Sequence, residues 1–266
     1  FAWISMKPDS TKQPVIEVRG LGLSYGSRTV LEGVSFEVTK GSCLAVMGAS
    51  GCGKSTLLKG MTGLLKPVNG QVTFDGSPMW GGGQLPYDDV LSKFGVLFQG
   101  GALWSSMNLL ENISLPLETF SRLNKQEIEN MASYKLSLVG LSGCEFLYPS
   151  ELSGGMQKRA GLARALAMDP EILFLDEPSA GLDPINSSQL DELILELKDS
   201  LGITFVVVTH ELDSIFSISD HSIFLSNQSK TILDQGKPLE LLEGSRLKEV
   251  RDFLGRSSRR KAKQSG

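Results

Sequence analysis

The sequence lacks a long uninterrupted apolar run. No stretch approaches the roughly 18–20 residues that a membrane-crossing helix needs. The segment Phe1–Ser10 has neither the basic start nor the long apolar stretch of a signal peptide. We therefore expect a cytoplasmic protein, and any membrane that it serves must be crossed by other chains.

Cysteine and excess positive charge are also scarce. The three cysteines, Cys43, Cys52 and Cys144, form no disulfide or metal-ligand framework, which favours a reducing compartment. The net charge of −4 gives no overall attraction to nucleic acid, so no nucleic-acid partner is expected. The charge is uneven, because Arg246–Gly266 holds eight basic and two acidic residues, a local +6, while the rest carries −10.

Short apolar strands alternate with helices along the chain. This alternation predicts an α/β fold with a mostly parallel sheet and a helical subdomain inserted at about 100–168. The strand-like runs are 15–19, 34–38, 43–47, 71–75, 94–98, 171–175 and 203–208, with a late hairpin of 223–225 and 231–234. Helical patterns cover 54–62, 187–201, 247–254 and the region from 108 to 167, which is broken at Pro116 and at 140–143.

One glycine-rich segment between a predicted strand and a predicted helix carries a phosphate-binding pattern. Gly48–Ser55 fits G-x-x-x-x-G-K-[ST] in the context that the motif requires, which disfavours a chance glycine-rich turn. Its glycines let N–H groups point at phosphates, and the helix start adds a positive dipole end. Lys54 can reach the β- and γ-phosphates, and Ser55 can hold Mg²⁺. The residues predicted to bind ATP here are Gly48, Ala49, Ser50, Gly51, Cys52, Gly53, Lys54, Ser55 and Thr56.

Two carboxylates follow another buried strand. Asp176 and Glu177 end the apolar run Ile172–Leu175, at the sheet edge where α/β proteins bind ligands. Asp176 is then placed to hold Mg²⁺, and Glu177 to act as general base on the attacking water. A solvated helix cap is the alternative, and the phosphate loop in the same chain favours the functional interpretation.

Five further segments complete a pattern that resembles the ABC ATPase family. Leu152–Met156 is similar to the LSGGQ signature, with Met156 where glutamine is commonest, and Ser179–Asp183 resembles the D-loop. The remaining matches are single residues that occur in the family order, namely Tyr25, Gln99 and His210. The resemblance extends from about 15 to 242. It implies a P-loop fold with an antiparallel β subdomain, an N-terminal extension 1–14, an ABC domain 15–245, and a short helix with a basic tail at 246–266.

The resemblance also implies a role for each of these residues. Ser153, Gly154 and Gly155 would bind the ATP of a second copy through the start of their helix, and Asp183 would lie beside the same nucleotide, which implies a dimer. Tyr25 would stack on adenine and His210 would contact the γ-phosphate. Gln99 would sense Mg²⁺ or water and link the site to a membrane partner. Each residue also has a structural alternative: an aromatic in a turn, a capped turn or a polar strand end.

Cys52 and His221 have plain structural interpretations. Cys52 is either a redox-sensitive thiol or a small residue at a tolerant position, and the second is favoured because a covered thiol is inert. His221 lies outside every motif, and we expect it to be structural.

Softer similarities point to one branch of the family, the ATPases of Mla and Mce lipid transporters. They lie at 97–103, 111–117, 149–156 and 250–254. The branch implies phospholipid transport, integral membrane permease subunits, a Mce-type lipid-binding protein and a location on the inner face of the cell membrane. The stretch 101–117 either receives a permease helix or packs the helical subdomain.

Several alternatives stay open. If the similarity to the lipid-transporter branch does not reflect function, two other functions remain. The chain would then be an importer ATPase for a polar solute, or an ABC ATPase acting on nucleic acid or ribosomes. The basic tail contacts anionic lipid headgroups, clasps the neighbouring ATPase or is simply solvated.

Overall fold

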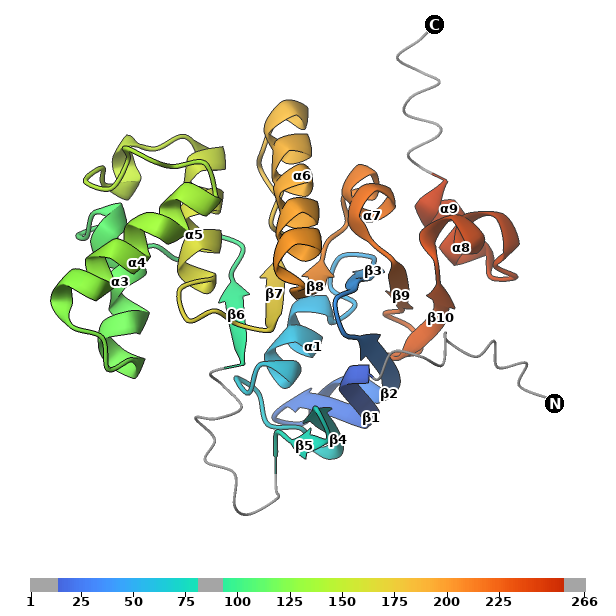
Figure 1. Ribbon diagram of the computed structural model, residues 1–266. Helices are drawn as coiled ribbons and strands as arrows, with labels where there is room; N and C mark the ends of the chain where they lie inside the picture. The colour runs from blue at the N-terminus through green and yellow to red at the C-terminus, as the bar shows by residue number, and fades with distance from the viewer. Residues whose placement is uncertain (1–13, 81–92, 256–266) are drawn as a thin grey trace, which may run out of the picture.

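The computed structural model describes residues 14–80 and 93–255, which form two sheets and a group of helices at one side (Figure 1). The N-terminal extension expected up to residue 14, except for Pro14, and the basic tail from Arg256 lie outside the described residues. In the described part, no helix combines the length and the apolar character needed to cross a bilayer.

The larger sheet has six strands in the order β10-β9-β3-β8-β7-β6. All neighbours are parallel except β10 and β9, which form the predicted late hairpin. Every residue of β3 and β8 is buried, as expected for continuous apolar strands covered on both faces. The bounds are β3 Cys43–Gly48, β6 Phe94–Leu97, β7 Ile172–Asp176, β8 Thr204–Val208, β9 His221–Leu225 and β10 Ile232–Gly236.

A smaller antiparallel sheet lies against helix α1 (Figure 1). Its order is β2-β1-β4-β5, with bounds β1 Pro14–Tyr25, β2 Arg28–Thr39, β4 Asn69–Phe74 and β5 Ser77–Pro78. Helix α1, Lys54–Met61, contributes Leu57, Leu58 and Met61 to one apolar cluster that also contains residues of β1, β3 and β7. This shared cluster fixes the start of α1 relative to both sheets.

The helices between β6 and β7 fall within 109–165, and Pro116 does not break the first of them. Helix α3 runs through Pro116, so the prediction of a break there is wrong. A proline inside a helix costs about 3 kcal/mol, and α3 offsets it with an Asn108–Glu111 capping box and a buried apolar face. The elements are α3 Leu109–Phe120, α4 Lys125–Leu138, the short 3₁₀ helix Pro149–Glu151 and α5 Gly154–Ala165.

The remaining helices cover the core sheet. Helix α6, Pro184–Leu201, begins three residues before the predicted start because Asp183 caps it and Pro184 suits the first turn. Helix α9, Lys248–Leu254, buries Phe253 against Phe224 of β9, with ring centroids 5.3 Å apart. The others are α7 Leu212–Ile218 and α8 Pro238–Gly244.

Candidate functional site

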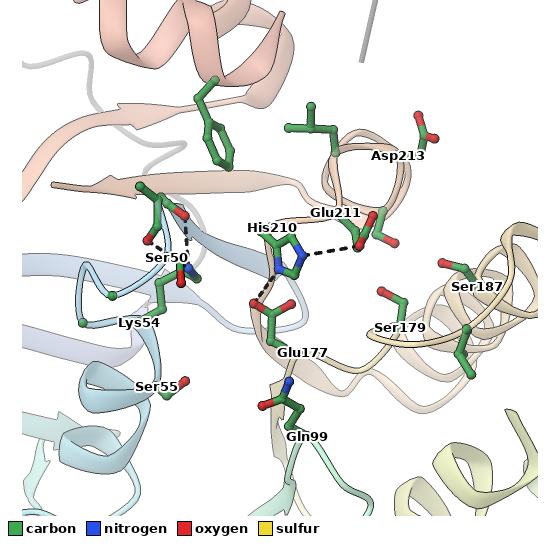
Figure 2. Close-up of a pocket in the computed structure, with 18 of the residues that line it drawn as sticks. Ser50, Lys54, Ser55, Gln99, Glu177, Ser179, Ser187, His210, Glu211 and Asp213 are labelled. Carbon is green, nitrogen blue, oxygen red and sulfur yellow. Dashed lines mark hydrogen bonds and ion pairs between the residues drawn. The ribbon is translucent and has the colours of Figure 1, made fainter. Parts of the chain in front are cut away.

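Polar residues follow four neighbouring parallel strands of the core sheet. Along the order β3, β8, β7, β6 the chain continues into the phosphate loop, His210, Asp176–Glu177 and Gln99. The carboxyl ends of parallel strands meet at one edge, so segments far apart in sequence come together there. Figure 2 shows Lys54, His210, Glu177 and Gln99 around a common space.

The phosphate loop requires glycine at two positions. Gly48 ends β3 with a φ of 147°, and a Cβ there would lie 2.4 Å from the carbonyl oxygen of Leu225. Gly53 caps α1 with a φ of 101°, and a Cβ there would lie 3.0–3.1 Å from the side chains of Leu31 and Val30. Only glycine fits both constraints, so the loop can curl tightly into the helix start.

Lys54 and Ser55 begin α1 and connect the loop to β7. The buried Lys54 Nζ donates to the carbonyl oxygens of Gly48 at 3.0 Å and Ala49 at 3.3 Å. Ser55 Oγ donates to Asp176 Oδ1 at 3.0 Å. Burial raises the pKa of Asp176, the Ser55 hydrogen bond lowers it, and the neighbouring Glu177 raises it further. A hydroxyl and a carboxylate at hydrogen-bond distance supply the oxygen ligands that Mg²⁺ prefers.

Glu177 and His210 form a contact pair beside this carboxylate. Glu177 Oε1 lies 2.8 Å from His210 Nδ1, and the other imidazole nitrogen lies 3.5 Å from Glu211 Oε1. Glu177 adopts a φ of 50°, and its N–H donates to the carbonyl of Val208 at 2.8 Å. A non-glycine residue in this region costs about 1–3 kcal/mol, so the surrounding contacts must hold it there.

Two buried polar atoms at this edge have no hydrogen-bond partner among the described residues, Glu177 Oε2 and Ser179 Oγ. Buried polar atoms normally have a hydrogen-bond partner, so two such atoms without one call for an explanation. Both residues line the same cleft as the phosphate loop. The two atoms therefore fit a ligand with polar groups of its own. The Ser179 hydroxyl could donate to a phosphate oxygen, and Glu177 Oε2 could accept from an attacking water.

The cleft has a volume of about 1840 Å³. Ordinary small-molecule sites measure about 300–1,000 Å³, so this cleft is large enough for a nucleotide. Tyr25, at the end of β1 and 47% exposed, lies in the wall with Arg28 of the same hairpin. Of the predicted site residues, those in the wall are Tyr25, Gly48, Ala49, Ser50, Gly51, Gly53, Lys54, Ser55, Thr56, Gln99, Glu177 and His210.

The signature residues Ser153, Gly154 and Gly155 do not line this cleft. Ser153 caps α5 by accepting from the N–H of Met156 at 3.3 Å. Gly155 lies against α6, because a Cβ there would be 2.9 Å from Asn186 Oδ1. Within one chain the signature and the phosphate loop are therefore separate features of the surface.

Asp183, Cys52 and His221 lie in three different local environments. Asp183 accepts from the N–H groups of Ile185 and Asn186 at 3.0 Å, and these bonds, led by that of Asn186, lower its pKa. Cys52 is 1% exposed, and burial raises its pKa, which favours the inert interpretation. His221 begins β9, where burial lowers its pKa.

Two buried charged residues near the site were not predicted from the sequence. Lys158 of α5 contacts the backbone at Gln99 and at Glu177, and Asp191 of α6 lies in the cleft wall. Lys158 is 59 residues from Gln99 and 19 residues from Glu177 in the sequence. Asp191 is 23 residues from its partner Ser214. No local pattern connects such distant residues.

The chain matches the ABC transporter family over residues 31–180. It is 38% identical to the intermembrane phospholipid transport system ATP-binding protein MlaF of Escherichia coli (strain K12), over 90% of this chain and 88% of that protein. It is 39% identical to the probable ribonucleotide transport ATP-binding protein mkl of Mycobacterium leprae (strain TN), over 90% of this chain and 68% of that protein. For mkl of Mycobacterium tuberculosis (strain ATCC 25618 / H37Rv) the identity is also 39%, and the chain spans only 66% of that protein.

Two solved structures share the fold. CbiO1 from Clostridium perfringens, described as part of the ABC transporter complex cbiONQ, gives a TM-score of 0.78 at 28% identity, covering 92% of this chain and 95% of that one. The ATP-binding cassette MJ0796, in a dimeric post-hydrolysis state bound to ADP and Pi, gives 0.74 at 29% identity, covering 84% and 98%. The α/β fold class predicted from the sequence is confirmed.

Proposed function

The chain belongs to the ABC transporter family, and from this premise we propose that it is the ATP-hydrolysing subunit of a transporter that moves phospholipid. The ATPase part is supported most directly by one observation. Ser55 and Asp176 are in hydrogen-bond contact 3.0 Å apart, next to Glu177 and the phosphate loop. Phosphoryl transfer to water needs a phosphate site, metal-binding oxygens and a base, and we assign these roles to the phosphate loop, to Ser55 with Asp176, and to Glu177.

Each residue then has a role in the reaction. Lys54 and the loop N–H groups bind the phosphates, while Tyr25 stacks on the base. Glu177 takes the proton of the attacking water, and His210 supports the γ-phosphate. Mg²⁺, held by Ser55, Asp176 and Gln99, would supply positive charge to the phosphate oxygens.

A second copy of the chain completes the site. Ser153 and the N–H groups of Gly154 and Gly155 lie outside their own cleft, so we propose that they bind the γ-phosphate held by the partner. Asp183 ends the neighbouring D-loop and lies beside the same nucleotide. The dimeric state of the MJ0796 cassette supports this arrangement.

The cargo and the membrane partners are the finer part of the proposal. The MlaF relatives, of which the chain spans 88–92%, are phospholipid transport proteins by name. We propose permease subunits and a Mce-type lipid-binding protein as partners, and a position on the inner face of the cell membrane. Trp104, which is 57% exposed, lies in the stretch 101–117 proposed to receive a permease helix. The ABC domain at 15–245 and the C-terminal segment 246–266 keep their proposed bounds.

Two substitutions test the ATPase part. Glu177→Gln keeps the shape of the side chain but removes the base, so the ATP hydrolysis rate should fall about 10²–10⁴-fold, while the Kd for ATP stays unchanged. Lys54→Ala should instead weaken ATP binding, because it removes a cation from the phosphate site. Steady-state phosphate release and nucleotide titration of purified protein separate the two effects. Wild-type turnover in the Glu177→Gln variant would refute the general-base assignment.

A polar-solute cargo is the second candidate, and the name of the mkl relatives favours it. Mass spectrometry of the detergent-extracted complex distinguishes the cargoes, because a phospholipid transporter should retain phospholipid at its substrate site. Co-purified ribosomes or nucleic acid, without a permease, would instead favour an ABC ATPase that does not act in transport.

A further inference from the structure

Lys158 is a buried lysine one helical turn beyond the signature residues. It lies on α5, five residues after Ser153, and only 7% of it is exposed. Burial lowers the pKa of its ammonium group, and the carboxylates of Glu177 and Asp176 act in the opposite direction. A lysine is rarely buried without a specific set of partners.

The partners of Lys158 are two backbone carbonyl groups of the candidate site. Its Nζ donates to the carbonyl oxygen of Gln99, after β6, and to that of Glu177, after β7, at 3.3 Å. A single ammonium group therefore joins the signature helix to both segments. Both bonds have the same charged donor, and a charged donor makes a hydrogen bond stronger than a neutral one.

The contact with Glu177 supports a strained peptide. The φ of 50° at Glu177 is costly for a residue with a side chain. Its N–H is held by Val208 and its carbonyl accepts from the N–H of Ala180 at 3.2 Å as well as from Lys158. Movement of Lys158 would thus shift the backbone that aims the Glu177 carboxylate toward His210 and the cleft.

The same helix serves the other nucleotide site of the proposed dimer. The signature residues at the start of α5 are proposed to bind the partner's γ-phosphate, and α5 is one helix of 12 residues from Gly154 to Ala165. An unbroken helix is a rigid element that can carry a displacement along its length. The helix therefore connects two contacts mechanically. Ser153 at its start faces the proposed partner, and Lys158 in its second turn bonds to Glu177 of the same chain.

We propose that Lys158 is a positioning residue that couples the two nucleotide sites of the dimer. When the start of α5 binds the partner's ATP, the ammonium group fixes Gln99 and Glu177 of its own chain in the arrangement for hydrolysis. Each site thereby becomes active only when the other is filled. The inference rests on the proposed function, because it assumes both the dimer and the general base.

The test compares Lys158→Met, Lys158→Arg and Lys135→Met in the full chain. Lys135→Met is a matched control, because Lys135 is also buried in the helical region, 2% exposed, but its ammonium group binds Asp169. The measurement is ATP hydrolysis over a range of ATP concentrations, which gives kcat, KM and the Hill coefficient. Thermal unfolding of each variant shows the cost to the fold.

Wild-type protein should hydrolyse ATP with a Hill coefficient above 1. Lys158→Met should lower kcat about 10–100-fold, a part of what loss of a general base costs, leave KM within about threefold and reduce the Hill coefficient to about 1. Lys158→Arg keeps the charge and the hydrogen-bond donors, so it should recover most of the wild-type kcat and of the wild-type Hill coefficient. Lys135→Met should retain the wild-type kcat and Hill coefficient even if it unfolds at a lower temperature.

Three outcomes overturn the coupling role: wild-type hydrolysis without cooperativity, an unchanged Hill coefficient in Lys158→Met, or an equal loss in Lys135→Met. The Glu177→Gln variant separates this failure from that of the proposed function. If Glu177→Gln is inactive while Lys158→Met keeps the wild-type values, only the coupling fails. If Glu177→Gln hydrolyses ATP normally, both fail.

Discussion

Asp191, on α6, has one carboxylate oxygen paired and the other buried without a partner. Asp191 Oδ2 accepts from Ser214 Oγ of α7 at 2.8 Å, while Oδ1 has no hydrogen-bond partner among the described residues. Burial raises the pKa of this carboxyl group to about 6. The folded state therefore keeps its proton at pH values where the unfolded chain has lost it.

The sign of the resulting pH dependence follows directly. Between the unfolded pKa of 3.8 and the folded pKa of about 6, the native state binds more protons, so the stability from this group is present at low pH and is lost as pH rises. Asp191→Asn removes the penalty and still accepts from Ser214. Relative to wild type, it should be more stable by about 1–3 kcal/mol at about pH 7.5 and equal at about pH 4.

Urea unfolding at several pH values measures this difference. Asp199→Asn is the matched control, because Asp199 is exposed on the same helix. A constant difference between Asp191→Asn and wild type from pH 4 to pH 7.5 would contradict the prediction.

At the residue scale, sequence motifs find the groups that lie next to each other in the chain. Lys54 with Ser55, and Asp176 with Glu177, could be predicted because a loop or a strand end presents them together. Lys158 could not, because its partners Gln99 and Glu177 are brought to it only by the packing of α5 against β6 and by its contact with the residue that follows β7. Its position is a result of tertiary structure.

At the scale of elements, Asn112 holds α3 to the loop that precedes it. The side chain is fully buried, and its Oδ1 accepts from the N–H of Trp104 at 2.7 Å. Its Nδ2 donates to the carbonyl oxygens of Trp104, Met107 and Asn108 at 3.0–3.1 Å. One amide therefore fixes the loop that carries the exposed Trp104.

Asn112→Ala should destabilise the protein by about 1–3 kcal/mol, because the N–H of Trp104 and the carbonyl of Met107 lose the hydrogen bonds that the buried amide supplies. Hydrogen exchange of the amides at 104–108 should accelerate more than that of the core strands. Gln126→Ala on α4, where the side chain is exposed, is the control and should change stability by less than about 0.5 kcal/mol. Unchanged exchange at Trp104 in Asn112→Ala would contradict this role.

The elements themselves were predictable to different degrees. The buried strands β3, β7 and β8 read as continuous apolar runs because both faces are covered. The predicted break at Pro116 is wrong, because the local Asn108–Glu111 capping box and the buried apolar face of α3, which is a tertiary feature, together offset the cost of the proline. The predicted start of α6 is three residues late, because the Asp183 cap and Pro184 in the first turn begin the helix at Pro184.

At the scale of the whole molecule, the candidate site is divided between two surfaces. The phosphate loop opens into the cleft, while Ser153–Gly155 lie at the start of α5, outside it. The α5 region packs on β6 and α6 at the side of the core sheet (Figure 1). The sequence showed that both segments exist, but only the three-dimensional arrangement shows that one chain cannot use them on the same phosphate.

The most direct test of the account is whether ATP joins two copies through these surfaces. Sedimentation velocity of Glu177→Gln, in which bound ATP is not consumed, should give a dimer with ATP and a monomer without it. Adding Ser153→Glu should place a negative charge at the proposed position of the partner's γ-phosphate, so the double variant should bind ATP but remain a monomer. A monomer at saturating ATP in the single variant, or a dimer of equal stability in the double variant, would contradict the account.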